Sequence, residues 1–259
     1  MQRSGSNWLR TMLDEREDLV APHPPHIMRD FMPIIGKFGD LSEDANFRIL
    51  VDHVCTFVER NQVPWKNKHD ENVVFCRHTI HKQAKESCDR ILLGQDFPAI
   101  EKELYLLSIF DAIMDFFTKT NGKSLWVCKS MGMSAYHKYL MQFYGEERLR
   151  YIYLVRDPRD VAMSFMKTPV GDCHWYAITK KWVNLQEKAI HVLEDTPELV
   201  HVVHYEELLA GKDVVVETIY DFIGARRFGG VTRQAVSRII FSSLFMHAEL
   251  CCKKDMLKL

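Results

Sequence analysis

Between residues 125 and 224 the chain alternates short apolar runs with longer amphipathic segments, and this alternation constrains the fold more than any other feature. The clearest run covers residues 151–155 and is continuously apolar, as in strands buried on both faces of a parallel sheet. Residues 125–128 and 199–203 form similar runs. Helical periodicity fills the gaps between them, in residues 134–144, 173–193 and 214–223. This order predicts βαβ units and an α/β fold in which helices flank a parallel sheet on both sides.

The preceding region, residues 20–124, is expected to be mainly helical. Residues 43–59 and 99–118 both repeat apolar side chains at intervals of three and four, which predicts two amphipathic helices. Residues 20–26 (VAPHPPH) contain three prolines within four positions, so we expect a rigid loop there. The short run at residues 73–76 is expected to be a buried strand.

Composition limits the classes of protein that the chain can represent. Its 259 residues can form one large α/β domain, and we treat residues 1–259 as a single domain. A net charge of −1 argues against a general nucleic-acid binder, so any anion site must be local. Seven cysteines without paired spacing favour a reducing compartment, and we expect a cytoplasmic location. No apolar run is long enough to span a membrane, and no signal peptide is visible, although a lost N-terminal targeting segment stays open.

The first nine residues, MQRSGSNWL, have the features of an anion-binding loop. Arg3 offers a full positive charge, Gly5 allows close backbone approach, and hydroxyl or amide donors come from Ser4, Ser6 and Asn7. Apolar residues then recur at helical spacing from Trp8, so the loop exposes backbone N–H groups at a helix N-terminus. The alternative is an ordinary capped helix behind a disordered terminus.

A second polar stretch follows the clearest predicted strand. Arg156 stands at the strand's exit, where ligands bind in open parallel sheets. Asp157 is a plausible helix N-cap with Pro158 at the first helical position, and Ser164 lies about two turns further on. The alternative is a structural junction in which Arg156 pairs with a neighbouring aspartate.

Together these two stretches resemble the cofactor signatures of the sulfotransferases that use 3′-phosphoadenosine 5′-phosphosulfate (PAPS). The first signature of that family is matched by residues 3–9, RSGSNWL, and the second by Arg156 with Ser164 eight positions later. The resemblance implies a P-loop-like fold in which Arg3, Ser4, Gly5, Ser6 and Asn7 hold the 5′-phosphosulfate. It also implies that Arg156 and Ser164 hold the 3′-phosphate, while Trp8 lies near the adenine.

Two weaker matches extend the resemblance. Residues 202–208, VVHYEEL, imply that Tyr205 contacts the adenine, and residues 126–130, WVCKS, imply that Lys129 lies at the reaction centre with Arg3 as a catalytic partner. Sulfuryl transfer depends on positioning and charge stabilisation, by analogy with phosphoryl transfer. The resemblance implies no metal.

The general base is left open by the sequence. The family's cytosolic branch has a histidine two positions after the lysine, and this chain has Met131 there. His78 and His81 are substitutes by chemistry alone. The acceptor, a hydroxyl or amine of a small molecule or carbohydrate, cannot be identified, and we expect residues 20–124 to select it.

Two features depart from the family's pattern. The first signature normally follows a β-strand, and this chain starts at the loop itself, so we expect an N-terminally truncated fold that lacks its first strand. No segment after Gly224 matches the family's basic, glycine-rich region. Two alternatives therefore remain: a non-catalytic sulfotransferase-like protein, or another P-loop enzyme, although the loop contains no lysine.

Overall fold

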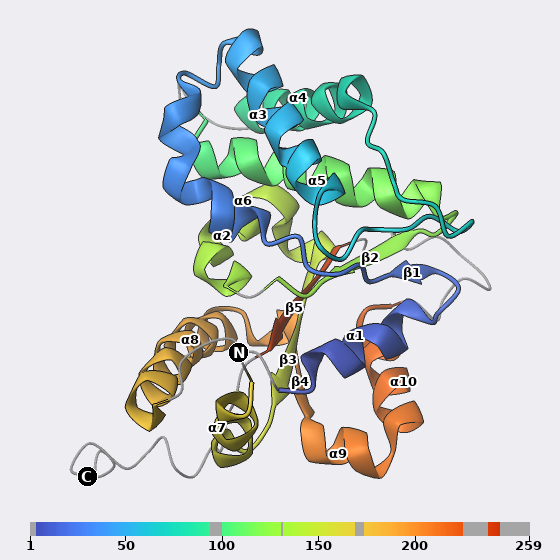
Figure 1. Ribbon diagram of the computed structural model, residues 1–259, viewed down its shortest axis with the longest axis vertical. Coiled ribbons are helices and arrows are strands. Elements are labelled where there is room, and N and C mark those ends of the chain that lie inside the picture. Colours follow the sequence, from blue (N-terminus) through green and yellow to red (C-terminus); the bar gives the residue numbers. More distant parts are fainter. Residues whose placement is uncertain (1–3, 94–99, 131, 169–173, 225–237, 244–259) are drawn as a thin grey trace.

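The computed structural model describes residues 4–93, 100–130, 132–168, 174–224 and 238–243, and it has a mixed α/β architecture (Figure 1). The elements lie in this order: α1 Ser6–Asp14, β1 Leu19–Val20, α2 Ile27–Phe31, η1 Met32–Phe38, α3 Asp44–Glu59, α4 Arg77–Leu93, α5 Lys102–Thr120, β2 Leu125–Cys128, η2 Met133–Tyr136, α6 His137–Arg148, β3 Leu149–Val155, α7 Pro158–Met166, α8 Trp175–Asp195, η3 Pro197–Leu199, β4 Val200–His204, α9 Tyr205–Ala210, α10 Lys212–Phe222 and β5 Arg238–Ser243. The three η elements are 3₁₀ helices.

The five strands among the described residues form one parallel sheet in the order β1-β2-β5-β3-β4. The predicted α/β class with a parallel sheet is thus confirmed. Strand β5, near the C-terminal end of the chain, lies between β2 and β3, in the middle of the sheet. Its residue Ile240 pairs with both Cys128 of β2 and Tyr151 of β3. We expected a sheet without its first strand; in the described sheet the central place is filled by β5, to which the sequence pattern assigned no element.

Successive strand residues point to opposite faces of the sheet, and both faces carry apolar side chains, so helices cover both faces. On one face Trp126 and Tyr151 belong to a large core that includes side chains of α3, α4, α5 and α6. On the other face Val127, Ile152 and Leu154 pack with residues of α1, α9 and α10. Figure 1 shows α3, α4 and α5 gathered on one side of the strands, with α1 and α10 on the other. A sheet covered in this way leaves its edge at the strand ends as the natural place for a ligand.

Most predicted elements are present with small shifts of their ends. The helix expected at residues 134–144 begins as the 3₁₀ turn η2 before it continues as α6. The Asp157 cap is confirmed, since its carboxylate accepts a hydrogen bond of 2.8 Å from the Arg159 N–H. Helices α2 and α4 and strand β1 were not predicted.

The strand predicted at residues 73–76 is wrong. This segment forms no strand and joins no sheet among the described residues. The backbone N–H of Phe75 donates to the Glu59 carboxylate at 2.7 Å, and its ring is buried against Trp65. A side chain thus replaces the neighbouring strand that the apolar pattern suggested.

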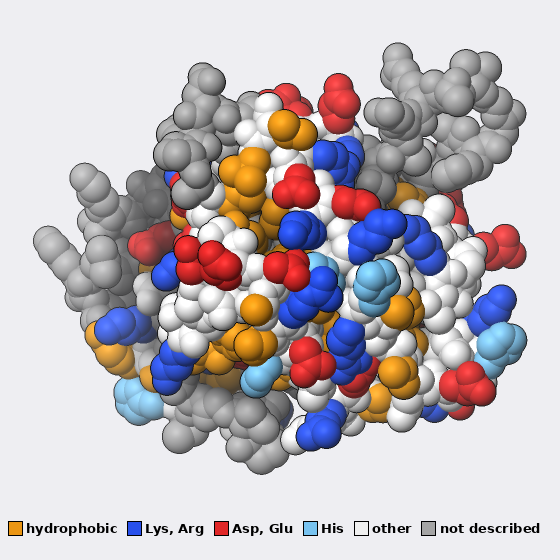
Figure 2. Space-filling model, turned by 90° about the horizontal axis from the view of Figure 1, so that it is seen from above, with side chains coloured by type: hydrophobic (Ala, Val, Ile, Leu, Met, Phe, Trp, Pro, Cys, Tyr) orange, Lys and Arg blue, Asp and Glu red, His pale blue; other side chains and the backbone are white. Residues whose placement is uncertain are grey.

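The helices above the sheet expose charges of both signs. Figure 2 shows this face, on which Lys and Arg side chains intermingle with Asp and Glu. Exposed charges on the helices also form ion pairs, such as Arg48 with Asp44 of α3 at 2.6 Å. No described helix combines the length and apolar character that crossing a membrane requires.

Candidate functional site

The carboxyl ends of the parallel strands bring four polar segments to one edge of the sheet. Lys129 and Ser130 follow β2, Arg156 follows β3, and Tyr205 follows β4. The proline loop, residues 21–26, follows β1. Segments that are far apart in the sequence therefore meet at the edge where open parallel sheets bind their ligands.

Tyr205 joins the two stretches that the sequence singled out. Its ring lies against Gly5, so close that a Cβ built on Gly5 would be only 2.2 Å from Cε2 of the ring. The Arg156 guanidinium lies 4.3 Å from the centroid of the same ring, and Trp8 meets it edge-on at 6.2 Å. Four of the predicted binding residues thus form one contiguous cluster.

The start of α1 presents backbone and hydroxyl donors to this cluster. Gly5 caps the helix in the left-handed conformation, with φ of 87°. Ser4 is fully buried, and its hydroxyl has no hydrogen-bond partner among the described residues. Ser6 is buried in the first turn, and the Asn7 amide oxygen accepts a hydrogen bond of 3.1 Å from Arg10 Nε. An unpaired buried hydroxyl is costly, so its presence beside a helix N-terminus fits a site for an anion.

The second stretch has a division of roles between its two arginines. Arg159 forms an ion pair with the Asp157 carboxylate at 2.6 Å, and this contact lowers the pKa of the carboxyl to about 2. Arg156 is instead directed to the Tyr205 ring. Ser164 lies half-buried on the second turn of α7. The predicted 3′-phosphate pair is therefore carried by β3 and α7, with Arg156 beside the cluster of Gly5 and Tyr205. Arg3 lies outside the described residues.

A group of cationic and imidazole side chains lies around Lys129. Burial and the nearby charge of Arg10 lower the pKa of Lys129 to about 8. Burial also lowers the pKa of Arg10, whose guanidinium donates to the Ala21 carbonyl. The pKa of His23 is lowered by burial and then by Arg10 and Lys129. The positive charges of these buried groups repel one another, so an anion bound between them would be stabilised.

His26 completes this group from the end of the proline loop. Its Nδ1 lies 3.0 Å from the hydroxyl of Ser130. Burial, the Arg29 charge and the Lys129 charge lower its pKa to about 4. Sequence reasoning missed His23, His26 and Arg10. The available signal was the pair of histidines among the three prolines of residues 22–26, a segment that the sequence pattern predicts only as a loop.

The histidines suggested by chemistry alone lie elsewhere. His78 is exposed at the start of α4, and the His81 ring packs against Phe47 and approaches Asp44 at 3.0 Å. Met131 lies outside the described residues. Among the described residues, no three His, Cys, Asp or Glu side chains gather as ligands for a metal would.

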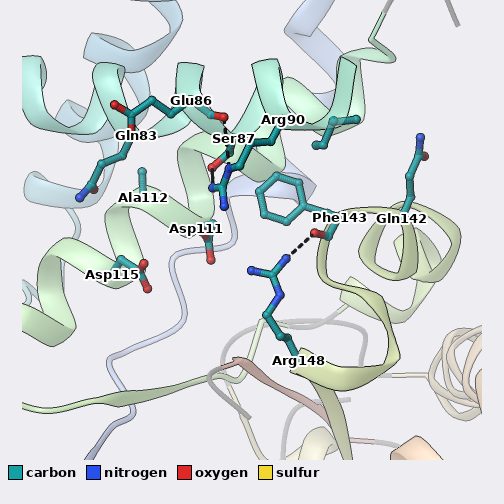
Figure 3. A pocket seen from close by; sticks show the side chains of 11 residues that line it. Gln83, Glu86, Ser87, Arg90, Asp111, Ala112, Asp115, Gln142, Phe143 and Arg148 are labelled. Carbon is teal, nitrogen blue, oxygen red and sulfur yellow. Dashed lines mark hydrogen bonds between the residues drawn. The ribbon is translucent and has the colours of Figure 1, made fainter. Parts of the chain in front are cut away.

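A polar cavity of about 570 Å³ lies between α4, α5 and α6 (Figure 3). Arg148 on its wall donates to the backbone carbonyls of Phe143 and Tyr144, at the end of α6. Because β3 begins at Leu149, this cavity lies near the strand's amino end, whereas Arg156 follows its carboxyl end. The cavity is separate from the cluster around Tyr205.

Comparisons with known proteins bear on the family of the chain. The model of the sulfotransferase family matches residues 1–228 of this chain. Among solved structures, the chain is similar to the sulfotransferase domain from the curacin biosynthetic pathway. The two share 17% identity with a TM-score of 0.46, over 86% of this chain and 71% of that one. Comparison with curated proteins finds no match.

Proposed function

Because the chain belongs to the sulfotransferase family, we propose that it transfers a sulfuryl group from PAPS to a hydroxyl or amine of a small-molecule or carbohydrate acceptor. The observation that carries this proposal is the contact of Tyr205 with both Gly5 and Arg156. It unites the loop expected to hold the 5′-phosphosulfate with the arginine expected to hold the 3′-phosphate. The scattered cysteines support a reducing compartment, and we propose the cytoplasm.

The residues present fit such a donor. The Ser4 hydroxyl is buried without a partner among the described residues, and it lies directly before the N-terminus of α1, which Gly5 caps. In our proposal Arg3, Ser4, Gly5, Ser6 and Asn7 hold the 5′-phosphosulfate through backbone and side-chain donors.

The nucleoside end is proposed to rest on the neighbouring cluster. Arg156 and Ser164 would hold the 3′-phosphate, and Trp8 and Tyr205 would contact the adenine. The rings of Trp8 and Tyr205 already meet edge-on in the described structure, which supports a planar ligand beside them.

Lys129 is proposed as the main catalytic cation, together with Arg3. When bound, PAPS supplies an activated sulfuryl group on a phosphate leaving group. The Lys129 ammonium then holds negative charge that develops on oxygen, in a partly buried setting where charge interactions are strong. Removal of one such donor typically raises the barrier by about 2.7–4 kcal/mol. No metal is needed for these roles.

Calorimetric titration with adenosine 3′,5′-bisphosphate tests the proposal. We expect Arg156→Ala to weaken binding by about 10- to 150-fold, which corresponds to about 1.5–3 kcal/mol for hydrogen bonds to a charged group. Arg159→Ala is the matched control, because this neighbouring arginine is 86% exposed and pairs with Asp157.

Two results would overturn the assignment: no binding by the unmodified chain, or equal affinity in the Arg156 and Arg159 variants. Tight binding without turnover on phenolic, alcohol, amine and carbohydrate acceptors would instead favour a non-catalytic sulfotransferase-like protein.

A further inference from the structure

We propose that His26 is the general base of the site and that Ser130 positions its ring. The inference rests on the proposed sulfuryl transfer and assigns the step that the sequence motifs leave open. Its starting point is geometric: the proline loop after β1 places an imidazole beside the residue that follows Lys129.

The contact with Ser130 defines which nitrogen of His26 is available. Nδ1 lies 3.0 Å from the Ser130 hydroxyl, and Ser130 is only 3% exposed. We assign Nδ1–H as the donor to this hydroxyl, which leaves a lone pair on Nε2. The same hydrogen bond persists in the imidazolium, so it also stabilises the protonated product. A base held by a third group is the usual arrangement in activated sites.

The backbone around His26 is held in an unusual conformation. His26 has φ of 51° and ψ of 24°, in the left-handed region that non-glycine residues rarely occupy. Ile27 and Met28, directly after it, are almost fully buried. On the N-terminal side of His26, the Trp65 indole N–H donates a hydrogen bond of 2.8 Å to the His23 carbonyl. A strained residue fixed from both sides is typical of positions that serve a function.

The charges around His26 come from three elements and are mostly positive. Arg29 of α2, Lys129 after β2 and His23 of the same loop all lower its pKa, whereas Asp30 raises it. The ring is therefore neutral near pH 7 and able to accept a proton. A polyanionic donor bound beside Lys129 opposes these charges, which raises the pKa of His26 and makes it a stronger base. The base thus gains strength only when the donor is in place.

The proton balance of the step is simple. The acceptor O–H or N–H transfers its proton to Nε2 of His26 while the acceptor atom forms its bond to sulfur. The sulfur–oxygen bond to the phosphate breaks, and its electron pair leaves with the phosphate oxygen. Lys129 stays protonated next to that oxygen, and the imidazolium releases its proton to solvent after the product departs.

The first experiment compares His26→Asn with His78→Asn. Asparagine keeps an N–H near the Nδ1 position and tolerates the left-handed backbone, but it lacks the Nε2 lone pair. His78→Asn changes an exposed histidine outside the site. We expect His26→Asn to slow release of adenosine 3′,5′-bisphosphate from PAPS, with phenol, alcohol or amine acceptors, by about 10²- to 10⁴-fold. Calorimetric affinity for the bisphosphate should stay unchanged, and His78→Asn should match the unmodified chain in both measurements.

The second experiment does not depend on turnover. NMR titration of the His26 ring should give a pKa that rises when adenosine 3′,5′-bisphosphate is added, and Ser130→Ala should change the tautomer signal of the ring nitrogens. A pKa that stays constant on saturation with the bisphosphate would overturn the inference.

Full activity in His26→Asn would also overturn it, as would loss of turnover in His23→Asn alone. If the unmodified chain fails to bind the bisphosphate at all, the proposed function itself falls first. If the unmodified chain binds the bisphosphate but the pKa of His26 does not change and His26→Asn keeps full activity, this inference alone is refuted.

Discussion

Replacement of Gly5 by alanine tests the closest contact in the candidate site. Gly5 has φ of 87° and ψ of −1°, and its missing Cβ would lie 2.2 and 2.4 Å from two carbons of the Tyr205 ring. The left-handed backbone alone costs an alanine about 1–2 kcal/mol. Displacing a packed ring adds about 1–3 kcal/mol, as in overpacked cores. We therefore expect Gly5→Ala to lower the free energy of unfolding by about 2–5 kcal/mol.

Gly132→Ala is a matched control for the backbone cost. Gly132 also caps a helix in the left-handed conformation, with φ of 87° and ψ of 0°, but no atom of the described part of the chain lies within 4 Å of the position of its missing Cβ. Urea unfolding of both variants should show an excess loss of about 1–3 kcal/mol for Gly5→Ala. In a double-mutant cycle, Tyr205→Ala should remove that excess.

Ligand affinity gives a second measurement of the same contact. Because the Arg156 guanidinium stacks on the Tyr205 ring, displacement of the ring should also displace the guanidinium. Gly5→Ala should therefore weaken binding of adenosine 3′,5′-bisphosphate beyond the effect of Gly132→Ala. Equal destabilisation by the two alanines would show that the ring swings away freely, and our reasoning about the site's close packing would be refuted.

Three further predictions concern protonation, the sheet and the core. Folding lowers the pKa of Lys129 from 10.5 to about 8, so the unfolded chain binds its proton more tightly between these values. The free energy of unfolding should then rise from pH 8 to 10.5 by up to about 3 kcal/mol, a gain that denaturation of Lys129→Met should not show. A chain ending at residue 243 should bind adenosine 3′,5′-bisphosphate like the full chain, whereas one ending at 237 lacks the strand that joins β2 to β3 and should lose binding in calorimetry. Tyr151→Phe removes the hydroxyl 2.9 Å from buried His137 Nδ1 and should cost about 1–3 kcal/mol in urea unfolding, and no loss would show that this nitrogen finds another partner.

Local signals were sufficient where one segment decides its own structure. The apolar run at β3 and the Asp157–Pro158 start of α7 have short-range causes, and both elements form close to the predicted positions. The run at residues 73–76 failed because its apolar pattern reflects burial against Trp65, while Glu59 satisfies the Phe75 N–H. Apolar character reports burial, and the partner of a backbone N–H depends on distant residues.

The candidate site was only half visible for the same reason. Motif spacing identified Gly5, Arg156 and Tyr205, and the fold brings them into contact. His26 carries no motif of its own. Its interest comes from the 3.0 Å contact with Ser130, a residue 104 positions away in the sequence.

The sequence by itself determined the α/β class, the order of most elements and the polar residues that end each strand. These follow from periodicity and from caps, which act over a few residues. Tertiary structure alone decided which segment fills the centre of the sheet. Strand β5 takes that place because the backbone N–H and C=O groups of β2 and β3 that face one another need hydrogen-bond partners. Hydrogen bonds between strands do not depend on how far apart the strands are in the sequence.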